Sequence, residues 1–210
     1  MALALAELPK LEAVELATCE VSVAAIQALP ERLRHFSVTS CPDADASVFG
    51  AMQRFRGLQS LGLDRFDREL WFHVTAETVP IGPAETATAI AAMPAQEPIA
   101  RMQAELLRQL PLRRFAYACP FPSPVLTAIG AMAHLRDVTL QWAGPFEVAS
   151  VAKVETLQRL RLAHGMFELE DLRPLAKHPS LEHLRLEWRW WTPTALAAGL
   201  PGVTISTNQR

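Results

Sequence analysis

A short apolar pattern recurs along the chain. Seven nine-residue segments carry apolar side chains at their first, fourth and sixth places. They begin at Leu11, Leu33, Leu58, Leu112, Leu135, Leu157 and Leu181. Successive starts lie 22 to 25 residues apart, except for an interval of 54 residues after Leu58. One pattern that returns at a spacing of about 20–29 residues is typical of repeat proteins. We therefore number the places of each unit from one to nine.

Each segment predicts a short strand. Places four and six alternate as side chains on one face of a strand do, so they should face a core while the residues between them face outward. The chain must then return before the next strand, and apolar residues at helical spacing predict helices there. The expected helices span residues 23–28, 48–55, 84–93, 99–110, 124–132, 169–176 and 193–196, and the candidate N-caps are Asp43, Asp45 and Ser123.

The long interval is the irregular part of the pattern. Residues 64–111 contain a strand candidate at 70–74, a proline-rich stretch at 79–83 and two of the expected helices. We interpret this segment as an insertion within one repeat, inside a single solenoid that covers residues 1–210. The alternative is a boundary between two sub-blocks of one solenoid, and the spacing allows both.

The repeated unit resembles that of the leucine-rich repeat family. The resemblance lies in the three apolar places, such as Leu181, Leu184 and Leu186, and in Cys19 and Cys41, which occupy the ninth place where the family has Asn or Cys. It covers most of residues 8–191, with residues 203–205 as a further strand. It implies an α/β leucine-rich-repeat solenoid of the ribonuclease-inhibitor-like or bacterial type. Parallel strands would line its concave face, and helices would cover its convex face.

The ninth place departs from the family in most units. The other units have Phe66, Pro120, Ala143, Gly165 and Arg189 there. The usual Asn or Cys hydrogen bonds to the turn are therefore expected to be missing in most repeats. We therefore regard the chain as a degenerate example and expect irregular turns after its strands.

Composition and charge narrow the function classes. Of the 210 residues, 50% are hydrophobic and 20% are charged, which allows a substantial core. The net charge of −2 argues against a basic nucleic-acid binder or membrane-surface binder. Three cysteines cannot form a complete disulfide framework, and no run of about 18 apolar residues is present. The first residues are apolar over a short stretch only and have no basic lead-in, so we do not expect them to act as a signal peptide. We therefore expect a cytoplasmic protein that contacts neither membrane nor nucleic acid.

Catalytic and metal-binding motifs are absent from the sequence. No H-E-x-x-H, C-x-x-C, G-x-S-x-G or phosphate-binding glycine pattern occurs. Cys19 and Cys41 should stack about 5 Å apart on neighbouring strands, and we interpret them as core thiols rather than as a disulfide or half a metal site. Cys119 is interpreted as a buried, inert thiol. The carboxylate pairs Glu168/Glu170 and Asp64/Asp67 fall in polar turns. We predict no enzymatic activity, metal or cofactor.

The concave surface carries the candidate binding site. Places three, five, seven and eight should face outward from the sheet, and in the C-terminal units they hold aromatic and basic residues. The candidate partner-binding residues are Trp142, Arg159, Arg161, His164, His183, Arg185 and Trp188. Trp and Arg are enriched among the residues that dominate protein interfaces. The alternative is that the arginines only keep this face soluble. Trp190 and Trp191 are interpreted mainly as a cap over the last repeat.

These observations favour a non-enzymatic module that recognises a protein partner on its concave face. Such a chain would act as a monomer or in a heteromeric complex, as an inhibitor or immunity protein or as an adaptor. One alternative is a structural or assembly subunit that uses the edges of the solenoid. The other is an enzyme with a site in the 64–111 insert, around Trp71, His73 and Glu77.

Overall fold

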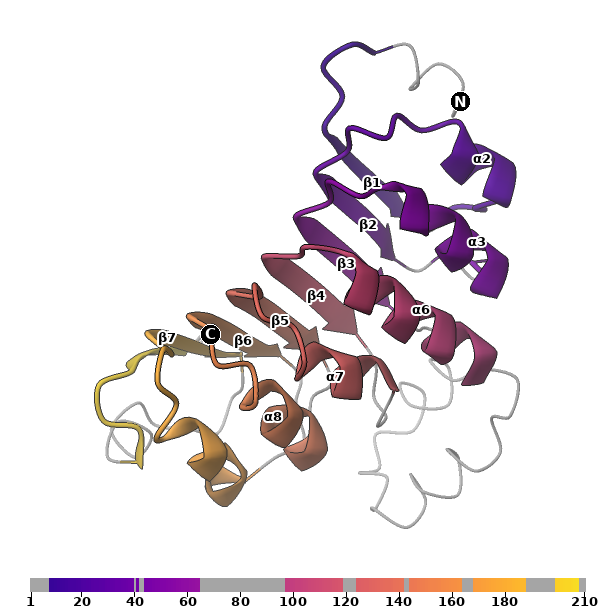
Figure 1. Cartoon of the computed structure of the whole chain (residues 1–210). Helices are drawn as coiled ribbons and strands as arrows, with labels where there is room; N and C mark the ends of the chain where they lie inside the picture. The colour runs from indigo at the N-terminus through magenta and orange to yellow at the C-terminus, as the bar shows by residue number, and fades with distance from the viewer. Residues whose placement is uncertain are drawn as a thin grey trace.

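The structure is a curved coil of parallel strands and helices, seen in a computed structural model (Figure 1). The structure describes residues 8–39, 41, 44–64, 97–118, 124–141, 144–163, 168–187 and 199–207. The strands are β1 (Ala13–Ala17), β2 (His35–Thr39), β3 (Ser60–Asp64), β4 (Arg114–Ala118), β5 (Asp137–Gln141), β6 (Arg159–Ala163), β7 (His183–Glu187) and β8 (Thr204–Thr207). They form one sheet in sequence order, and every pair is parallel.

The register of the sheet follows the repeat. Place four of one unit pairs with place four of the next, as Val138 pairs with Leu160 and Leu160 with Leu184. At the start of the strands, the place-two carbonyls of the first six units each accept two N–H groups from the following unit, and that of Glu182 accepts the Thr204 N–H. The Arg136 carbonyl, for example, accepts from Gln158 at 2.8 Å and from Arg159 at 2.9 Å. The solenoid that the sequence predicts is therefore confirmed: the units stack in one frame as successive layers.

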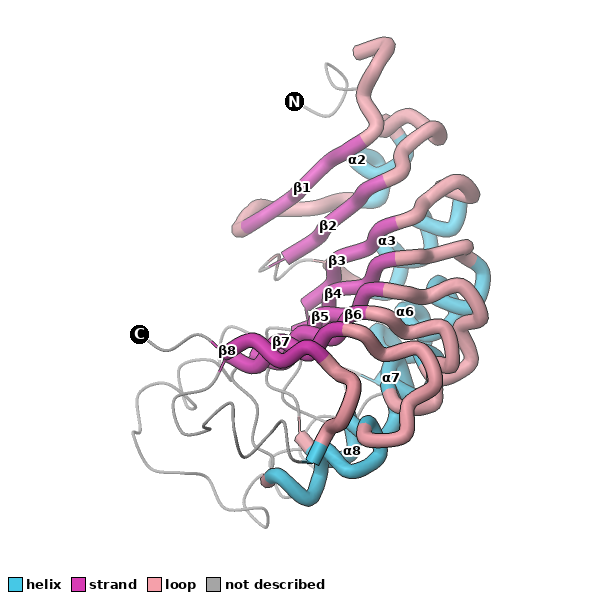
Figure 2. Tube along the Cα trace, turned by 90° about the vertical axis from the view of Figure 1, so that its left-hand side faces the viewer, coloured by secondary structure: helices cyan, strands magenta, loops and turns pink. Residues whose placement is uncertain are grey.

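Helices cover the convex side of the sheet (Figure 1 and Figure 2). The helical segments are α2 (Val23–Gln27), α3 (Ala46–Ala51), η1 (Met52–Arg54), α6 (Glu97–Gln109), α7 (Pro124–Ile129), α8 (Pro145–Val151) and η3 (Leu169–Leu175). All but α8 were expected from the sequence, although η3 is a 3₁₀ rather than an α-helix. The helices expected at 84–93 and 193–196 lie outside the described residues. None of the described helices is long and apolar enough to cross a bilayer.

Local sequence explains where these helices begin. Asp45 is the N-cap of α3, and its Oδ1 accepts the backbone N–H groups of Ser47 at 2.9 Å and Val48 at 3.1 Å. The helix α8 begins after Gly144, whose N–H donates to Glu147 Oε2 at 2.8 Å. The candidate caps Asp43 and Ser123 lie outside the described residues.

The core fills the space between sheet and helices. Places one, four and six of the central units are buried, and Leu58, Leu135 and Leu157 have no exposed surface. At the N-terminal end, the place-four and place-six residues Val14 and Leu16 are only half-buried. Because each unit contacts only its neighbours, the first strand has one side fewer to pack against.

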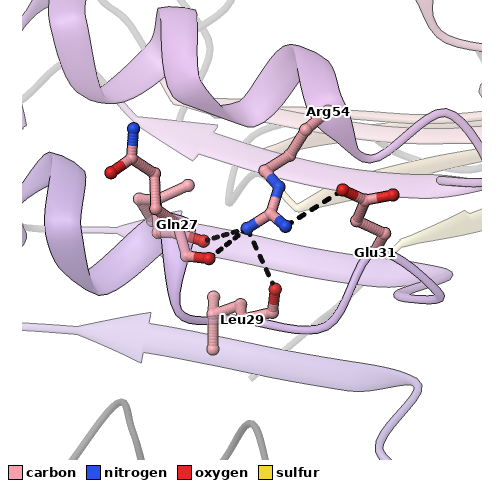
Figure 3. Close-up of polar contacts among 5 residues, drawn as sticks. Gln27, Leu29, Glu31 and Arg54 are labelled. Atoms are coloured by element: carbon pink, nitrogen blue, oxygen red, sulfur yellow. Dashed lines mark hydrogen bonds and ion pairs between the residues drawn. The ribbon is translucent and has the colours of Figure 1, made fainter.

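Side chains from the helical returns connect successive units. Arg54, at the end of η1, donates to the carbonyls of Ile26 at 3.4 Å, Leu29 at 3.2 Å and also Gln27, and its Nη2 donates to Glu31 Oε1 at 3.0 Å (Figure 3). These carbonyls belong to the last turn of α2 and the residues after it. Arg54 therefore links its own unit to the end of the preceding helical return, and at Ile26 it adds to a carbonyl that already accepts the Leu29 N–H at 3.1 Å.

The long interval does not break the sheet. β3 pairs directly with β4, from Ser60 opposite Arg114 to Asp64 opposite Ala118. The helix α6 returns the chain to β4 on the convex side (Figure 1). The strand candidate at 70–74 lies outside the described residues, and the division into one solenoid with an insert at 64–111 stays a prediction.

Candidate functional site

The concave face carries two stacked rows of outward side chains over the C-terminal half of the sheet. Places three, five and seven all point outward, because side chains alternate along a strand. Place three forms one row across the strands, and places five and seven form the other. We call seven of these residues the concave patch: Arg114, Asp137, Arg159, Arg161, His183, Arg185 and Glu187. Most of them are exposed, whereas places four and six of the same strands are buried.

In the first row, one carboxylate bridges two arginines. Asp137 lies on β5, between Arg114 on β4 and Arg159 on β6. Its Oδ2 accepts from Arg114 Nε at 3.1 Å, and its Oδ1 accepts from Arg159 Nη1 at 3.3 Å. Both arginine side chains are more than half exposed, whereas that of Asp137 is 25% exposed. The ion pairs with Asp137 therefore orient both arginine side chains while leaving them exposed to solvent.

In the second row, one carboxylate again bridges two arginines, but Glu187 lies on the same strand as Arg185, β7. Glu187 Oε2 lies 2.8 Å from Arg161 Nη2, and Glu187 Oε1 lies 2.9 Å from Arg185 Nη2. Arg161 and Arg185 are register partners on β6 and β7. Glu187 is the best covered of the three, with 15% of its side chain exposed.

The patch combines fixed geometry with an excess of positive charge. Four guanidinium groups share two carboxylates across it. Exposed ion pairs contribute only about 0–1 kcal/mol each to folding. A guanidinium has five N–H donors, and a bridging carboxylate uses one or two of them. The Arg114 and Arg159 side chains are more than half exposed, and their guanidinium groups can donate further hydrogen bonds to a planar anion or a carbonyl.

The structure brings four of the predicted site residues together. Arg159 on β6 lies opposite His183 on β7, and Arg161 on β6 lies opposite Arg185 on β7. The three other candidates, Trp142, His164 and Trp188, lie outside the described residues, so their part in the site stays a prediction.

Sequence reasoning did not select Arg114 or the two bridging carboxylates as site residues. The signal for Arg114 was available, because it occupies place three of its unit, where the repeat directs a side chain outward. Asp137 and Glu187 also occupy outward places. Nothing in their spacing, however, indicates that each would bridge two arginines.

The cysteines of the first two units form a thiol pair. Cys19 Sγ and Cys41 Sγ lie 3.8 Å apart, and neither residue forms a disulfide. The predicted stacking is confirmed, although only Cys41 is fully buried. Cys119 lies outside the described residues. Within the described ranges, no three His, Cys, Asp or Glu side chains are grouped closely enough to hold a metal ion.

The carboxylate pairs from the turns lead to no shared site. Glu168 and Glu170 are exposed around the start of η3, where the Glu168 N–H donates to Asp171 Oδ2 at 2.7 Å. That contact closes the first turn of the helix. Asp67 lies outside the described residues, as does the side chain of Asp64.

Comparisons with known proteins found similar solved structures but no matching family model or curated sequence. No protein-family model matches the chain, and no curated protein matches its sequence. Among solved structures, it is similar to the leucine-rich repeat-containing protein LegL7 from Legionella pneumophila, with a TM-score of 0.41 and 13% identity, over 100% of this chain and 87% of that one. It is also similar to the yeast Rad7 and Elc1 complex, with a TM-score of 0.34 and 12% identity, over 97% of this chain and 70% of that one. The assignment of the chain as a leucine-rich-repeat-like solenoid therefore rests on its own strand ladder.

Proposed function

We propose that the chain is a non-enzymatic protein-binding module that recognises a protein partner through its concave patch. The observation that carries the proposal is the arrangement of Arg114, Arg159, Arg161 and Arg185. Two carboxylates hold these arginines in line on one rigid sheet, yet more than two-fifths of each arginine side chain stays exposed. Arginines that are already oriented lose less side-chain entropy on binding than free ones do.

The patch indicates the chemistry of the partner surface. The excess of guanidinium groups over carboxylates suits a partner that presents carboxylates and backbone carbonyls. In the repeat, Trp142, His164 and Trp188 all occupy place eight, at the end of the strands that form the patch. We expect them to add aromatic contact area at its rim. The bound state itself would be the function, either inhibition of the partner or the joining of two partners.

The test compares partner capture by matched variants. The immobilised full-length chain, its Arg159→Ala/Arg161→Ala/Arg185→Ala variant and an Arg108→Ala/Arg173→Ala control are exposed to the same lysate. Arg108 and Arg173 are exposed arginines on the convex side, each beside a helical carboxylate. We expect a protein that the wild type and the control capture and the triple variant does not.

Calorimetry with that purified protein then measures single substitutions. Replacing Arg161, Trp142 or Trp188 by Ala should weaken binding by about 2–4 kcal/mol if each is buried in the complex. Equal capture by the triple variant would contradict the proposal and move the binding surface off the concave patch.

One observation favours a second candidate function, that of an assembly subunit. Within the described residues, the outer edge of β1 has no strand partner, and its core side chains Val14 and Leu16 are half-buried. An open edge strand invites pairing with another chain. Light scattering across a range of concentrations tests this function, because a constant monomer mass would count against it. The enzyme alternative depends on Trp71, His73 and Glu77, which lie outside the described residues and stay a prediction.

A further inference from the structure

A second basic surface lies along the edge where the strands begin. Place two of each unit precedes the strand, and the loops that lead into the strands stack side by side there (Figure 2). Over the middle of this edge is a recess of about 670 Å³. We call it the basic recess, and the residues that matter for its chemistry are Arg32, Arg34, Gln59, Arg113, His134 and Arg136.

The backbone holds the place-two residues in one row. The Arg34 carbonyl accepts from the N–H of Gln59 at 2.8 Å, the Gln59 carbonyl from that of Arg113 at 2.8 Å, and the Arg113 carbonyl from that of Arg136 at 2.9 Å. These four residues therefore stand on consecutive units. At about 4.8 Å per strand, the row from Arg34 to Arg136 is about 14–15 Å long.

The positive charge of the row is poorly compensated. Arg34 has only a long contact with Glu12, 3.8 Å from Nε to Oε1, and more than half of each side chain is exposed. Arg113 and Arg136 are exposed neighbours, and no carboxylate of the described residues lies within ion-pair distance of either. Like charges on adjacent strands repel each other. An anion between them would turn that repulsion into attraction.

The limits of the row point to a short anionic ligand. The place-two residues beyond its two ends are Glu12 and the pair Gln158 and Glu182. Within the place-two row, positive charge is therefore confined to the middle units. An extended peptide covers about 14–15 Å with four or five residues. A nucleic acid would carry its charge past both ends, and among the described residues no Phe, Tyr or Trp lines the recess to stack its bases, which leaves His134 as the one imidazole there.

We propose that the basic recess binds a short acidic segment of a protein in extended conformation. Carboxylates of the segment would pair with Arg113 and Arg136 at one end of the row and with Arg34 and Arg32 at the other. Gln59, between these pairs, can donate to a backbone carbonyl of the segment through its side-chain amide. The site lies outside the concave patch, so either proposal can fail without the other.

The test measures binding of defined probes to the full-length chain by fluorescence anisotropy. The probes are a labelled hexapeptide of alternating Glu and Asp, its Gln/Asn counterpart, and a labelled thymidine oligonucleotide of equal charge. We expect the acidic peptide to bind, the amide peptide to bind at least tenfold more weakly, and affinity to fall from about 20 mM to about 150 mM NaCl as screening increases.

Matched variants locate the binding. Arg113→Gln/Arg136→Gln should lower the affinity for the acidic peptide at least tenfold. Arg108→Gln/Arg173→Gln, which removes the same charge from the convex side, should change it less than twofold. A triple Arg159→Gln/Arg161→Gln/Arg185→Gln variant of the concave patch should also retain binding. Thermal unfolding of each variant verifies that it is folded.

Three outcomes would overturn the proposal. The first is the absence of peptide binding up to about 1 mM at low salt. The second is an equal loss of affinity in the convex-side control, which would show that only the overall charge matters. The third is tighter, Arg113-dependent and Arg136-dependent binding of the oligonucleotide than of the peptide, which would make the recess a nucleic-acid site.

Discussion

At the scale of single residues, buried polar groups stand out against the apolar core. Gln103 on α6 has no exposed surface, and within the described structure neither its Nε2 nor its Oε1 has a hydrogen-bond partner. A buried amide without partners costs free energy that an apolar side chain of similar size does not. The helix α6 therefore carries a polar group that weakens rather than supports its packing.

Replacing this amide should stabilise the protein. We expect Gln103→Leu to raise the free energy of unfolding by about 1–3 kcal/mol, measured by urea denaturation, because it removes two unsatisfied polar atoms. Gln103→Glu is the matched control and should destabilise the chain, because it buries a charge at the same place. A destabilised Leu variant would contradict the expectation and indicate that the amide is hydrogen-bonded in solution.

Glu147 is a second buried polar residue, and it should make stability depend on pH. Desolvation raises the pKa of its carboxyl group above the ordinary value of 4.5, although hydrogen bonds from its own N–H and that of Gly144 oppose the shift. A carboxyl whose pKa is raised by folding stabilises the folded state below its unfolded pKa. This contribution is lost as the pH rises through its folded pKa.

The Glu147→Gln variant isolates this effect, because glutamine can still accept the Gly144 N–H. We expect the melting temperature of the variant minus that of the wild type to increase from about pH 4.5 to about pH 7. Calorimetry of both proteins over this range measures the difference. If it stays constant with pH, Glu147 does not titrate differently in the folded and unfolded states.

At the scale of elements, the connection between one return and the next depends on a few side chains. Arg54 reaches from η1 to the end of α2 and to Glu31, and its guanidinium carbon also lies 5.8 Å from the centre of the Phe55 ring. Hydrogen bonds from a charged donor to carbonyls are worth about 1.5–3 kcal/mol. One side chain therefore ties two neighbouring units together.

Removing the Arg54 side chain should destabilise the protein. We expect Arg54→Ala to lower the free energy of unfolding by about 2–3 kcal/mol, measured by denaturant unfolding, because it removes the charged hydrogen bonds to the Gln27 and Leu29 carbonyls and the ion pair with Glu31. Arg54→Lys should retain only part of this, since an ammonium group lacks the planar fork that serves several acceptors. Arg173→Ala, whose side chain is 78% exposed, is the control and should change stability by less than about 0.5 kcal/mol. Equal changes in the free energy of unfolding for Arg54→Ala and Arg173→Ala would contradict the stabilising role of Arg54.

The elements also show what the sequence could and could not predict. The strands were predictable because places one, four and six must be apolar to be buried in the core. Apolar residues at these places recur visibly along the sequence. The helix α8 was not predicted, because Gly144 caps it through its backbone and Phe146 is 47% exposed. η3 is 3₁₀ in part because Pro174, inside it, has no N–H to donate.

The candidate site was predictable to a lesser extent. The repeat places Arg159, Arg161, His183 and Arg185 on the outward face, because alternation along a strand depends on sequence alone. The bridges through Asp137 and Glu187 depend on side-chain conformations across neighbouring strands, which a linear pattern does not specify. The basic recess depends on which units become neighbours, and that required β3 to pair directly with β4.

At the scale of the whole molecule, the eight described strands form one continuous sheet with unequal ends. Every unit contacts only its neighbours, so an inner strand is held from two sides and a terminal strand from one. The core residues of β1 are half-buried, and so is Ile205 of β8, whereas those of β4 to β7 are buried. Local stability should therefore be highest in the middle of the solenoid and fall toward both ends.

Hydrogen–deuterium exchange measures this gradient. We expect the amides of β5 and β6 to exchange slowest, at rates set by global unfolding, and those of β1 and β8 to exchange at least tenfold faster, because fraying of a terminal unit breaks one interface rather than two. A Leu160→Ala substitution in β6 should cost about 2–5 kcal/mol and accelerate exchange across the central strands. Val14→Ala in β1 should cost less and act only locally. Uniform protection from β1 to β8 would contradict the gradient and show that the chain opens as one cooperative unit, with the concave patch and the basic recess losing their geometry together.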